Sequence, residues 1–117
     1  MRRATILVVE DDALIRMMIA GMVEELGHRV VAETGTVQDA KVLVDAASFD
    51  LALLDVSIAG QSIAPVAEML VRRCLPFLLV SGSEESSLPE PLSKALVLRK
   101  PFAISKLKDA IETILAG

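Results

Sequence analysis

The 117-residue chain is poor in the residues that build cross-linked, base-stacking or membrane-spanning proteins. It has one cysteine, Cys74, so no internal disulfide can form, and this suits a reducing compartment. It has three phenylalanines and neither tryptophan nor tyrosine, which disfavours the aromatic platforms on which single-stranded nucleic acids stack. No segment reaches the roughly 18 uninterrupted apolar residues that span a membrane.

The net charge and the N-terminal pattern limit the possible partners and compartment of the protein. Sixteen acidic residues against twelve basic ones give a formal charge of −4, and an acidic surface repels phosphate backbones. The basic start at 1–3 and the apolar run after it resemble the beginning of a signal peptide, but the run ends at the acidic residues 10–12. We therefore expect a cytoplasmic protein with no nucleic-acid or membrane partner. Hydrophobic residues make up 53%, enough for the core of one domain over 1–117, with no output domain.

Short apolar runs alternate with helical periodicity along the chain. Strands are expected at 6–9, 29–33, 50–54, 77–80 and 95–98, and amphipathic helices between about 15–26, 40–47, 63–74 and 104–115. Residues 56–61 are expected to form a loop. The segment 81–93 holds two prolines and five serines, so the fourth helix is expected to be short or disordered. This alternation predicts an α/β fold, a doubly wound parallel sheet with helices on both faces.

Four residues at or near the ends of the predicted elements have specific expectations. Asp12 is expected to be the N-cap of the first helix, with the alternative that it is a third metal-binding acid. Thr36 is expected to cap the second helix. We interpret His28 as a solvent-exposed loop residue in preference to a phosphohistidine or metal ligand, and Cys74 as a packed core thiol in preference to a redox centre.

Polar side chains follow the predicted strands at the points where they end. Glu10 and Asp11 follow the first strand, Asp55 the third, Ser81 the fourth and Lys100 the fifth. The ligand site of a parallel α/β sheet lies beyond the carboxyl ends of its strands. If the strand order is 2-1-3-4-5, the first and third strands are neighbours and their acids converge. Crowded carboxylates repel one another, and Mg²⁺, which accepts carboxylate oxygens, relieves that repulsion.

These residue types fit phosphoryl transfer to an aspartate. An aspartate carboxylate can form an acyl phosphate, while a metal ion and Lys100 neutralise the phosphoryl oxygens and Ser81 supplies a hydroxyl. For any single residue, the simpler interpretation is an acid that caps a helix or faces solvent. That interpretation is poor for a whole set in which every residue type stands at the appropriate strand end.

Four segments carry a resemblance to a known family. They are ILVVEDD at 6–12, Asp55 after DLALL at 50–54, VSG at 80–82 and KPF at 100–102. Together they resemble the receiver domain of two-component response regulators, and the resemblance covers essentially the whole chain. It implies a flavodoxin-like (βα)5 fold with strand order 2-1-3-4-5.

The resemblance also implies an activity. Asp55 would be the phosphoacceptor, taking a phosphoryl group from the phosphohistidine of a sensor histidine kinase. The domain would catalyse its own phosphorylation and a slow Mg²⁺-dependent dephosphorylation, without being a conventional turnover enzyme. The output would be binding to an unknown downstream protein, or service as a phosphate shuttle or sink.

Individual residues receive roles from the same resemblance. Glu10, Asp11, Asp55 and the backbone carbonyl of Ser57 would hold Mg²⁺, with Glu10 acting mainly through water. Ser81 would be the switch hydroxyl that follows the phosphoryl group. Lys100 would pair with the phosphoryl group from a turn whose bond to the following proline is commonly cis in the family.

Three features depart from the usual pattern of the family. Val97 stands where receivers typically place an aromatic residue, the loop at 56–60 lacks the customary proline, and the segment 81–93 is broken by prolines. In these three features the chain resembles an atypical group of single-domain response regulators that work with HWE-type histidine kinases.

Two other function classes stay open at this point. The first is an interaction module that kept the fold without being phosphorylated, which Val97 favours and the complete set of acids disfavours. The second is a small hydrolase or a flavin binder. The sequence disfavours both, because a hydrolase would need a second acid after Asp55 and a flavin would need aromatic cover. The chain is expected to be a monomer or a weak homodimer that pairs through its final helix.

Overall fold

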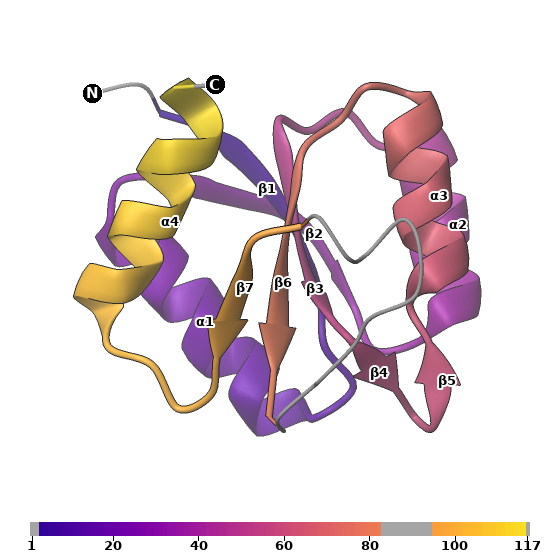
Figure 1. The fold of residues 1–117 in the computed structure, drawn as a ribbon, viewed down its shortest axis with the longest axis horizontal. Helices are drawn as coiled ribbons and strands as arrows, with labels where there is room; N and C mark the ends of the chain where they lie inside the picture. Colours follow the sequence, from indigo (N-terminus) through magenta and orange to yellow (C-terminus); the bar gives the residue numbers. More distant parts are fainter. Residues whose placement is uncertain (1–2, 83–94, 117) are drawn as a thin grey trace.

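A parallel five-stranded sheet forms the centre of the molecule (Figure 1). The computed structural model describes residues 3–82 and 95–116. The strand order is β2-β1-β3-β6-β7, which confirms the predicted order 2-1-3-4-5 when the five sheet strands are counted along the chain. These strands are β1 (Thr5–Val9), β2 (Arg29–Thr34), β3 (Leu51–Asp55), β6 (Phe77–Ser81) and β7 (Val97–Arg99).

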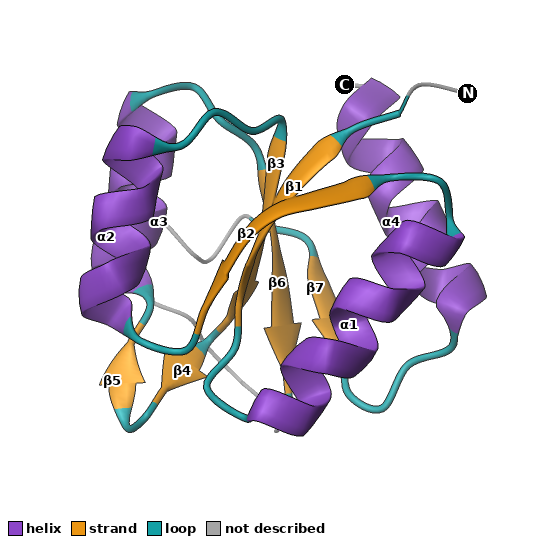
Figure 2. Cartoon of the chain, turned by 180° about the vertical axis from the view of Figure 1, so that it is seen from behind, coloured by secondary structure: helices purple, strands orange, loops and turns teal. Residues whose placement is uncertain are grey.

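Within residues 3–82 and 95–116, two helices cover each face of the sheet. Helices α1 (Ala13–Glu25) and α4 (Ile104–Ala116) lie on one face, and α2 (Val37–Ala46) and α3 (Ala64–Arg72) lie on the other (Figures 1 and 2). Successive strand side chains point to opposite faces, so β1 contributes to two separate cores. Ile6 and Val8 pack with α1 and α4, while Leu7 and Val9 pack with α2 and α3. This confirms the doubly wound α/β fold.

The predicted helix starts are confirmed by their caps. The Asp12 side chain accepts hydrogen bonds from two amides of the first turn of α1, at 3.0 and 3.2 Å. The Thr36 hydroxyl accepts one from the Asp39 amide of α2 at 3.0 Å. Gly27 follows α1 with a φ of 94°, a conformation that side chains disfavour and glycine adopts readily.

The predicted loop at 56–61 is instead a small antiparallel hairpin. Strand β4 (Ser57–Ile58) pairs with β5 (Gln61–Ser62) around a two-residue turn. Ala59 and Gly60 in the turn have φ values of 51° and 81°. Two consecutive positive φ values match the twist of a tight hairpin, and the glycine makes one of them easy to adopt. The hairpin lies beyond the carboxyl end of β3 (Figure 1).

Two smaller expectations were wrong. His28 is buried, and its Nδ1 accepts a hydrogen bond from the buried Ala4 amide at 3.0 Å. Cys74 is exposed, because the chain turns out of α3 with a left-handed backbone at this residue, φ 57°. The last sheet strand begins two residues later than predicted. The expectation that the fourth helix, within 81–93, is short or disordered falls outside the described residues, which include only Ser81 and Gly82 of that segment. None of the helices that the structure describes is long and apolar enough to cross a membrane.

Candidate functional site

Strand register brings two acids face to face at the carboxyl edge of the sheet. Val9 of β1 is paired with Leu54 of β3, so the next residues along each strand, Glu10 and Asp55, are neighbours. The ladder continues beyond β1, because the Glu10 amide donates to the Thr34 carbonyl of β2 at 3.0 Å. Glu10 and Asp55 each stand two residues after a side chain that faces α1 and α4, namely Val8 and Leu53. Because side chains alternate along a strand, both acids lie on that same face of the sheet.

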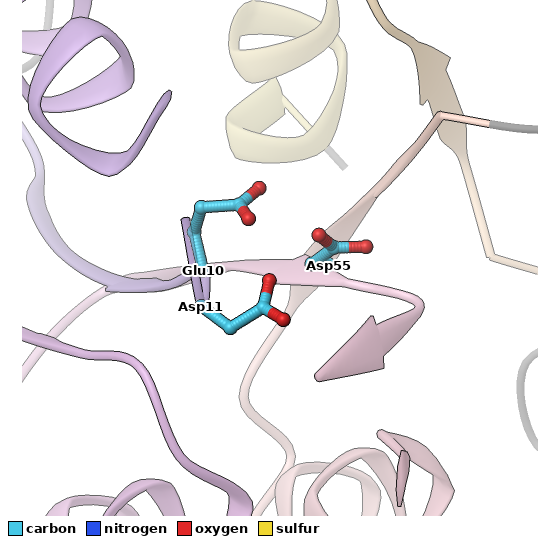
Figure 3. Close-up of side chains that lie close together, drawn as sticks. All are labelled: Glu10, Asp11 and Asp55. Atoms are coloured by element: carbon cyan, nitrogen blue, oxygen red, sulfur yellow. The ribbon is translucent and has the colours of Figure 1, made fainter. Parts of the chain in front are cut away.

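Three carboxylates lie together at this edge. One oxygen from each of Glu10, Asp11 and Asp55 lies within 4.8 Å of the others. In Figure 3 the carboxylates of Glu10 and Asp11 point toward the side on which Asp55 lies. Glu10 is 1% exposed and Asp55 8% exposed, while Asp11 is exposed to solvent. The cluster therefore has a buried floor and an open side.

Lys100 closes the cluster from the opposite side. Its Nζ lies 2.7 Å from Oε1 of Glu10 and 3.0 Å from Oδ2 of Asp55. The Lys100 amide donates to the carbonyl of Ser81 at 2.8 Å, so the lysine is held at the end of β6. The Lys100–Pro101 bond is cis, as the family resemblance implied. Ser81 is 2% exposed and ends the strand that neighbours β3, one residue beyond the partner of Asp55.

The two adjacent acids have pKa shifts of opposite sign. Burial raises the pKa of Glu10 above its ordinary value of 4.5, against the hydrogen bonds from Lys100 and the Asp12 amide. A hydrogen bond from the Ala59 amide, 2.8 Å from Oδ2, lowers the pKa of Asp11 below 3.8. Burial by itself would lower the pKa of Lys100, but its bonds to Glu10 and Asp55 outweigh burial and raise it above 10.5.

The hairpin turns the backbone of Ser57 toward Asp55. In an antiparallel pair, hydrogen-bonded and non-bonded residue pairs alternate. Ile63 donates to the Val56 carbonyl at 3.1 Å, so the next pair, Ser57 with Ser62, is a non-bonded one. The amide and carbonyl of Ser57 therefore point away from β5, and the amide donates to Oδ1 of Asp55 at 3.3 Å. The Ser57 carbonyl is thus available on the side of the acids.

The residues present fit a hard divalent cation. All the donors are oxygens, two carboxylates are only partly compensated by one lysine, and the exposed side at Asp11 leaves room for water. Asp12, the alternative third acid, has its side chain engaged as the cap of α1, so the cluster is made of Glu10, Asp11 and Asp55.

Sequence reasoning missed two supports of the cluster. The Ala59 amide, which binds Asp11, gives no signal in a side-chain pattern. Arg16 of α1 donates through Nη1 to the Glu10 carbonyl at 2.7 Å. A signal for Arg16 does exist, since it is a cation in the first turn of a helix, where the helix dipole is unfavourable to positive charge.

Comparison with known proteins decides the family. The family model of the response regulator receiver domain matches residues 6–112. The chain belongs to this family. Receiver domains act in two-component signalling and interact with histidine kinases.

Three relatives illustrate the neighbourhood of the chain within the family. It is 35% identical over 111 residues to the transcriptional regulatory protein PdtaR of Mycobacterium tuberculosis, covering 92% of this chain and 54% of PdtaR. It is 30% identical over 117 residues to the phyllosphere-induced regulator PhyR of Methylorubrum extorquens, covering 94% of this chain and 43% of PhyR. The chain thus spans about half the length of these two relatives.

The third relative is similar over its whole length. The solution structure of SdrG from Sphingomonas melonis Fr1 matches with a TM-score of 0.85 and 34% identity, covering 97% of each chain. The BeF3-activated conformation of SdrG from Pseudomonas melonis Fr1 matches with a TM-score of 0.81 and 35% identity, covering 95% of each chain.

Proposed function

We propose that this receiver takes a phosphoryl group from the phosphohistidine of a histidine kinase onto Asp55. The observation that carries the proposal is the bridging position of Lys100, whose Nζ contacts both Glu10 and Asp55 beside the exposed Asp11. A purely structural ion pair does not need three carboxylates at one strand edge, because the third acid only adds repulsion. A site that receives a polyanionic group uses the acids for a cation and the lysine for the phosphoryl oxygens.

Each residue of the site has a part in the proposed step. An oxygen of the Asp55 carboxylate forms a bond to phosphorus while the nitrogen–phosphorus bond of the donor breaks, and the electron pair stays on the donor imidazole. Lys100 leaves Asp55 for a phosphoryl oxygen and neutralises part of its charge. The Ser57 amide orients Asp55 from the other side, through Oδ1. Ser81, buried at the end of β6, is the switch hydroxyl of this proposal.

Mg²⁺ is the proposed cofactor, held by Glu10, Asp11, Asp55 and the Ser57 carbonyl. When bound, it neutralises the charge that three acids and a phosphoryl group bring together. The free direction of the Ser57 carbonyl and the oxygen-only donor set support this assignment. Water would slowly hydrolyse the acyl phosphate on Asp55 and release inorganic phosphate, which returns the domain to its resting form.

An apolar groove beside the site supports approach by a protein donor. A cavity of about 410 Å³ lies between α1 and the turn after β7, and its wall includes Lys100 itself. Met18 and Met22 line it from α1, and Pro101 and Phe102 line it from the turn. Methionines adapt to different partner shapes. We propose that the kinase, of HWE type in keeping with the atypical sequence features, docks here with its histidine toward Asp55.

The output of the phosphorylated state is proposed to be protein binding or a shuttle or sink role. Val97 is half-buried against the core that includes Leu79, its partner on β6, and a valine has no ring whose rotation could report phosphorylation. The signal therefore travels by another route than the aromatic switch. The BeF3-activated conformation of SdrG supports the idea that a receiver of this sequence type responds to a phosphoryl mimic.

Intact-mass measurement after incubation with acetyl phosphate and Mg²⁺ tests the proposal. The wild type should gain the mass of one phosphoryl group, and Asp55→Asn should gain none. Asp50→Asn is the matched control, since Asp50 lies at the opposite end of β3 and contacts Thr5. Failure of the wild type to gain mass, from acetyl phosphate and from HWE-type kinases alike, would favour the alternative of an unphosphorylated interaction module.

A second arm tests the docking groove. Met18→Glu should slow transfer from a phosphorylated HWE-type kinase far more than transfer from acetyl phosphate, because a buried charge opposes docking. Equal slowing with both donors would remove the groove from the proposal.

A further inference from the structure

Arg16 is the one basic residue of α1, and it lies in the first turn of that helix. A positive charge is unfavourable there, because the amides of the first turn already carry partial positive charge. Its side chain is 24% exposed, so it is mostly withdrawn from water. A cation in this position needs local acceptors, and the structure shows two.

Both acceptors belong to the surroundings of the acid cluster. Nη1 of Arg16 donates to the backbone carbonyl of Glu10 at 2.7 Å, and Nε lies 3.4 Å from Oε1 of Glu33 on β2. Arg16 does not hold a carboxylate of the cluster. It holds the peptide group that joins Glu10 to Asp11, the two acids of the β1 edge.

The peptide group before it and the side chain of Glu10 are also held in place. The Glu10 amide donates to Thr34 at 3.0 Å, and Oε2 of Glu10 accepts from the Asp12 amide at 3.1 Å. Because a peptide group is planar, the direction of the Glu10 carbonyl also sets the direction in which Asp11 leaves β1. Arg16 thus contacts the carbonyl on whose direction the placement of both acids depends.

Gly35 leaves the space that Arg16 occupies. A β-carbon at this residue would lie 2.8 Å from Nη1 of Arg16 and 3.4 Å from the Glu10 carbonyl oxygen. A side chain at residue 35 would therefore push the guanidinium away from Glu10 while leaving its charge in the protein. The absence of a side chain at Gly35, just after β2, therefore allows the contact between Arg16 of α1 and the Glu10 carbonyl.

We propose that Arg16 is a positioning residue that orients Glu10 and Asp11 for cation binding, with Glu33 and Gly35 as its supports. The inference rests on the proposed function for the use of the cation, but the orientation itself is a property of the protein without metal. Partners that hold metal ligands in place typically change metal affinity by about 10- to 100-fold when they are removed.

The test compares five proteins: wild type, Arg16→Gln, Arg16→Lys, Gly35→Ala and Arg73→Gln. Arg73→Gln is the matched control, because it makes the same charge change in an ion pair with Asp45 on α2. Titration calorimetry with MgCl₂ gives the Kd of each protein, and circular dichroism gives its Tm. Two backbone amide signals report the acids without metal, namely Asp12 for Glu10 and Ala59 for Asp11.

Arg16→Gln should raise the Kd for Mg²⁺ about tenfold and shift both amide signals in metal-free buffer. Gly35→Ala should change both in the same direction to a smaller extent, and Arg16→Lys should recover part of the affinity. Arg73→Gln should leave both readouts unchanged, even where its Tm falls. A Kd and amide signals at wild-type values in Arg16→Gln and Gly35→Ala would overturn the inference.

The result is separable from that of the proposed function. If the wild type takes no phosphoryl group while Arg16→Gln moves the Asp12 and Ala59 signals, the proposed function fails and the positioning role stands. If the wild type is phosphorylated and Arg16→Gln leaves those signals and the Kd unchanged, the positioning role fails alone.

Discussion

The two ends of the parallel sheet use similar polar residues in opposite ways. At the amino end, Asp50 accepts from both the amide and the hydroxyl of Thr5, at 2.9 and 3.1 Å, and His28 accepts from the Ala4 amide. At the carboxyl end, Glu10, Asp11 and Asp55 are crowded together, and Lys100 pairs with Glu10 and Asp55. At the first end, each of these acceptors is paired with backbone or hydroxyl donors, whereas the second end holds more negative charge than the described partners balance.

This difference distinguishes an acid that supports the fold from an acid that belongs to a binding site, and it does so without comparison to any relative. An aspartate that finds donors in the backbone and side chains of its neighbours is complete, and nothing further has to bind. An aspartate that faces two other acids is not complete, and a cation or a phosphoryl group changes its energy strongly. The contrast can be sharpened by removing partners at each end.

The largest expected effect on stability follows the removal of Lys100. In metal-free buffer at neutral pH, Lys100→Met should lower the free energy of unfolding by about 3 kcal/mol, because Glu10 remains buried beside Asp55 without a counter-charge. Because the pKa of Lys100 is raised above 10.5, its stabilising contribution is present below that pH and is lost as the pH rises further. Wild type and variant should therefore converge in alkaline buffer, as measured by urea unfolding.

The control for this loss is an exposed ion pair. Arg73 and Asp45 have side chains 48% and 61% exposed, and exposed pairs contribute about 0.2–1 kcal/mol. If Arg73→Gln and Lys100→Met lowered the free energy of unfolding equally, Lys100 would contribute no more to stability than an exposed ion pair, which would contradict the prediction.

A smaller loss is expected at the amino end. His28→Ala should lower the free energy of unfolding by about 2 kcal/mol, because it leaves the buried Ala4 amide without its acceptor. His28→Asn, which can offer an oxygen near the place of Nδ1, should recover part of the loss. Phosphorylation by acetyl phosphate should stay at the wild-type rate in both variants, and a slower rate in the folded variants would show that the two ends are coupled.

The smallest effects should differ in sign between two adjacent acids. The pKa of Glu10 is raised, so its ionised form weakens the fold at neutral pH, and Glu10→Gln should raise Tm in metal-free buffer. The pKa of Asp11 is lowered, so its ionised form strengthens the fold, and Asp11→Asn should lower Tm. The first difference should vanish as the pH falls below 4.5 and the second as it falls below 3.8. Shifts of the same sign at neutral pH would contradict this assignment.

The sequence was sufficient for the parts of the fold that depend on patterns of side chains. The continuous apolar run at 6–9 predicted a strand buried on both faces, and Asp12 and Thr36 predicted helix caps, because these features are local. The convergence of Glu10 and Asp55 followed once the neighbours of β1 were known, since parallel strands end at the same edge.

The features that were not predicted depend on contacts between distant backbone groups. The hairpin at 57–62 has no Asn-Gly or Asp-Gly signal, and Ala59 contributes to the site only through its amide. The buried His28 pairs with the Ala4 amide, which lies 24 residues away in the sequence. Cys74 completes an apolar periodicity that the helix does not follow, because the helix ends at Arg72.

Thermal unfolding with and without saturating Mg²⁺ tests most directly the claim that the carboxyl end is completed by a cation. Mg²⁺ should raise the Tm of the wild type and of Asp50→Asn, because a ligand that binds only the folded state stabilises it. It should leave the Tm of Asp11→Asn almost unchanged, since this variant loses an exposed carboxylate of the cluster. An equal response to Mg²⁺ in all three proteins, or none in the wild type, would contradict the account.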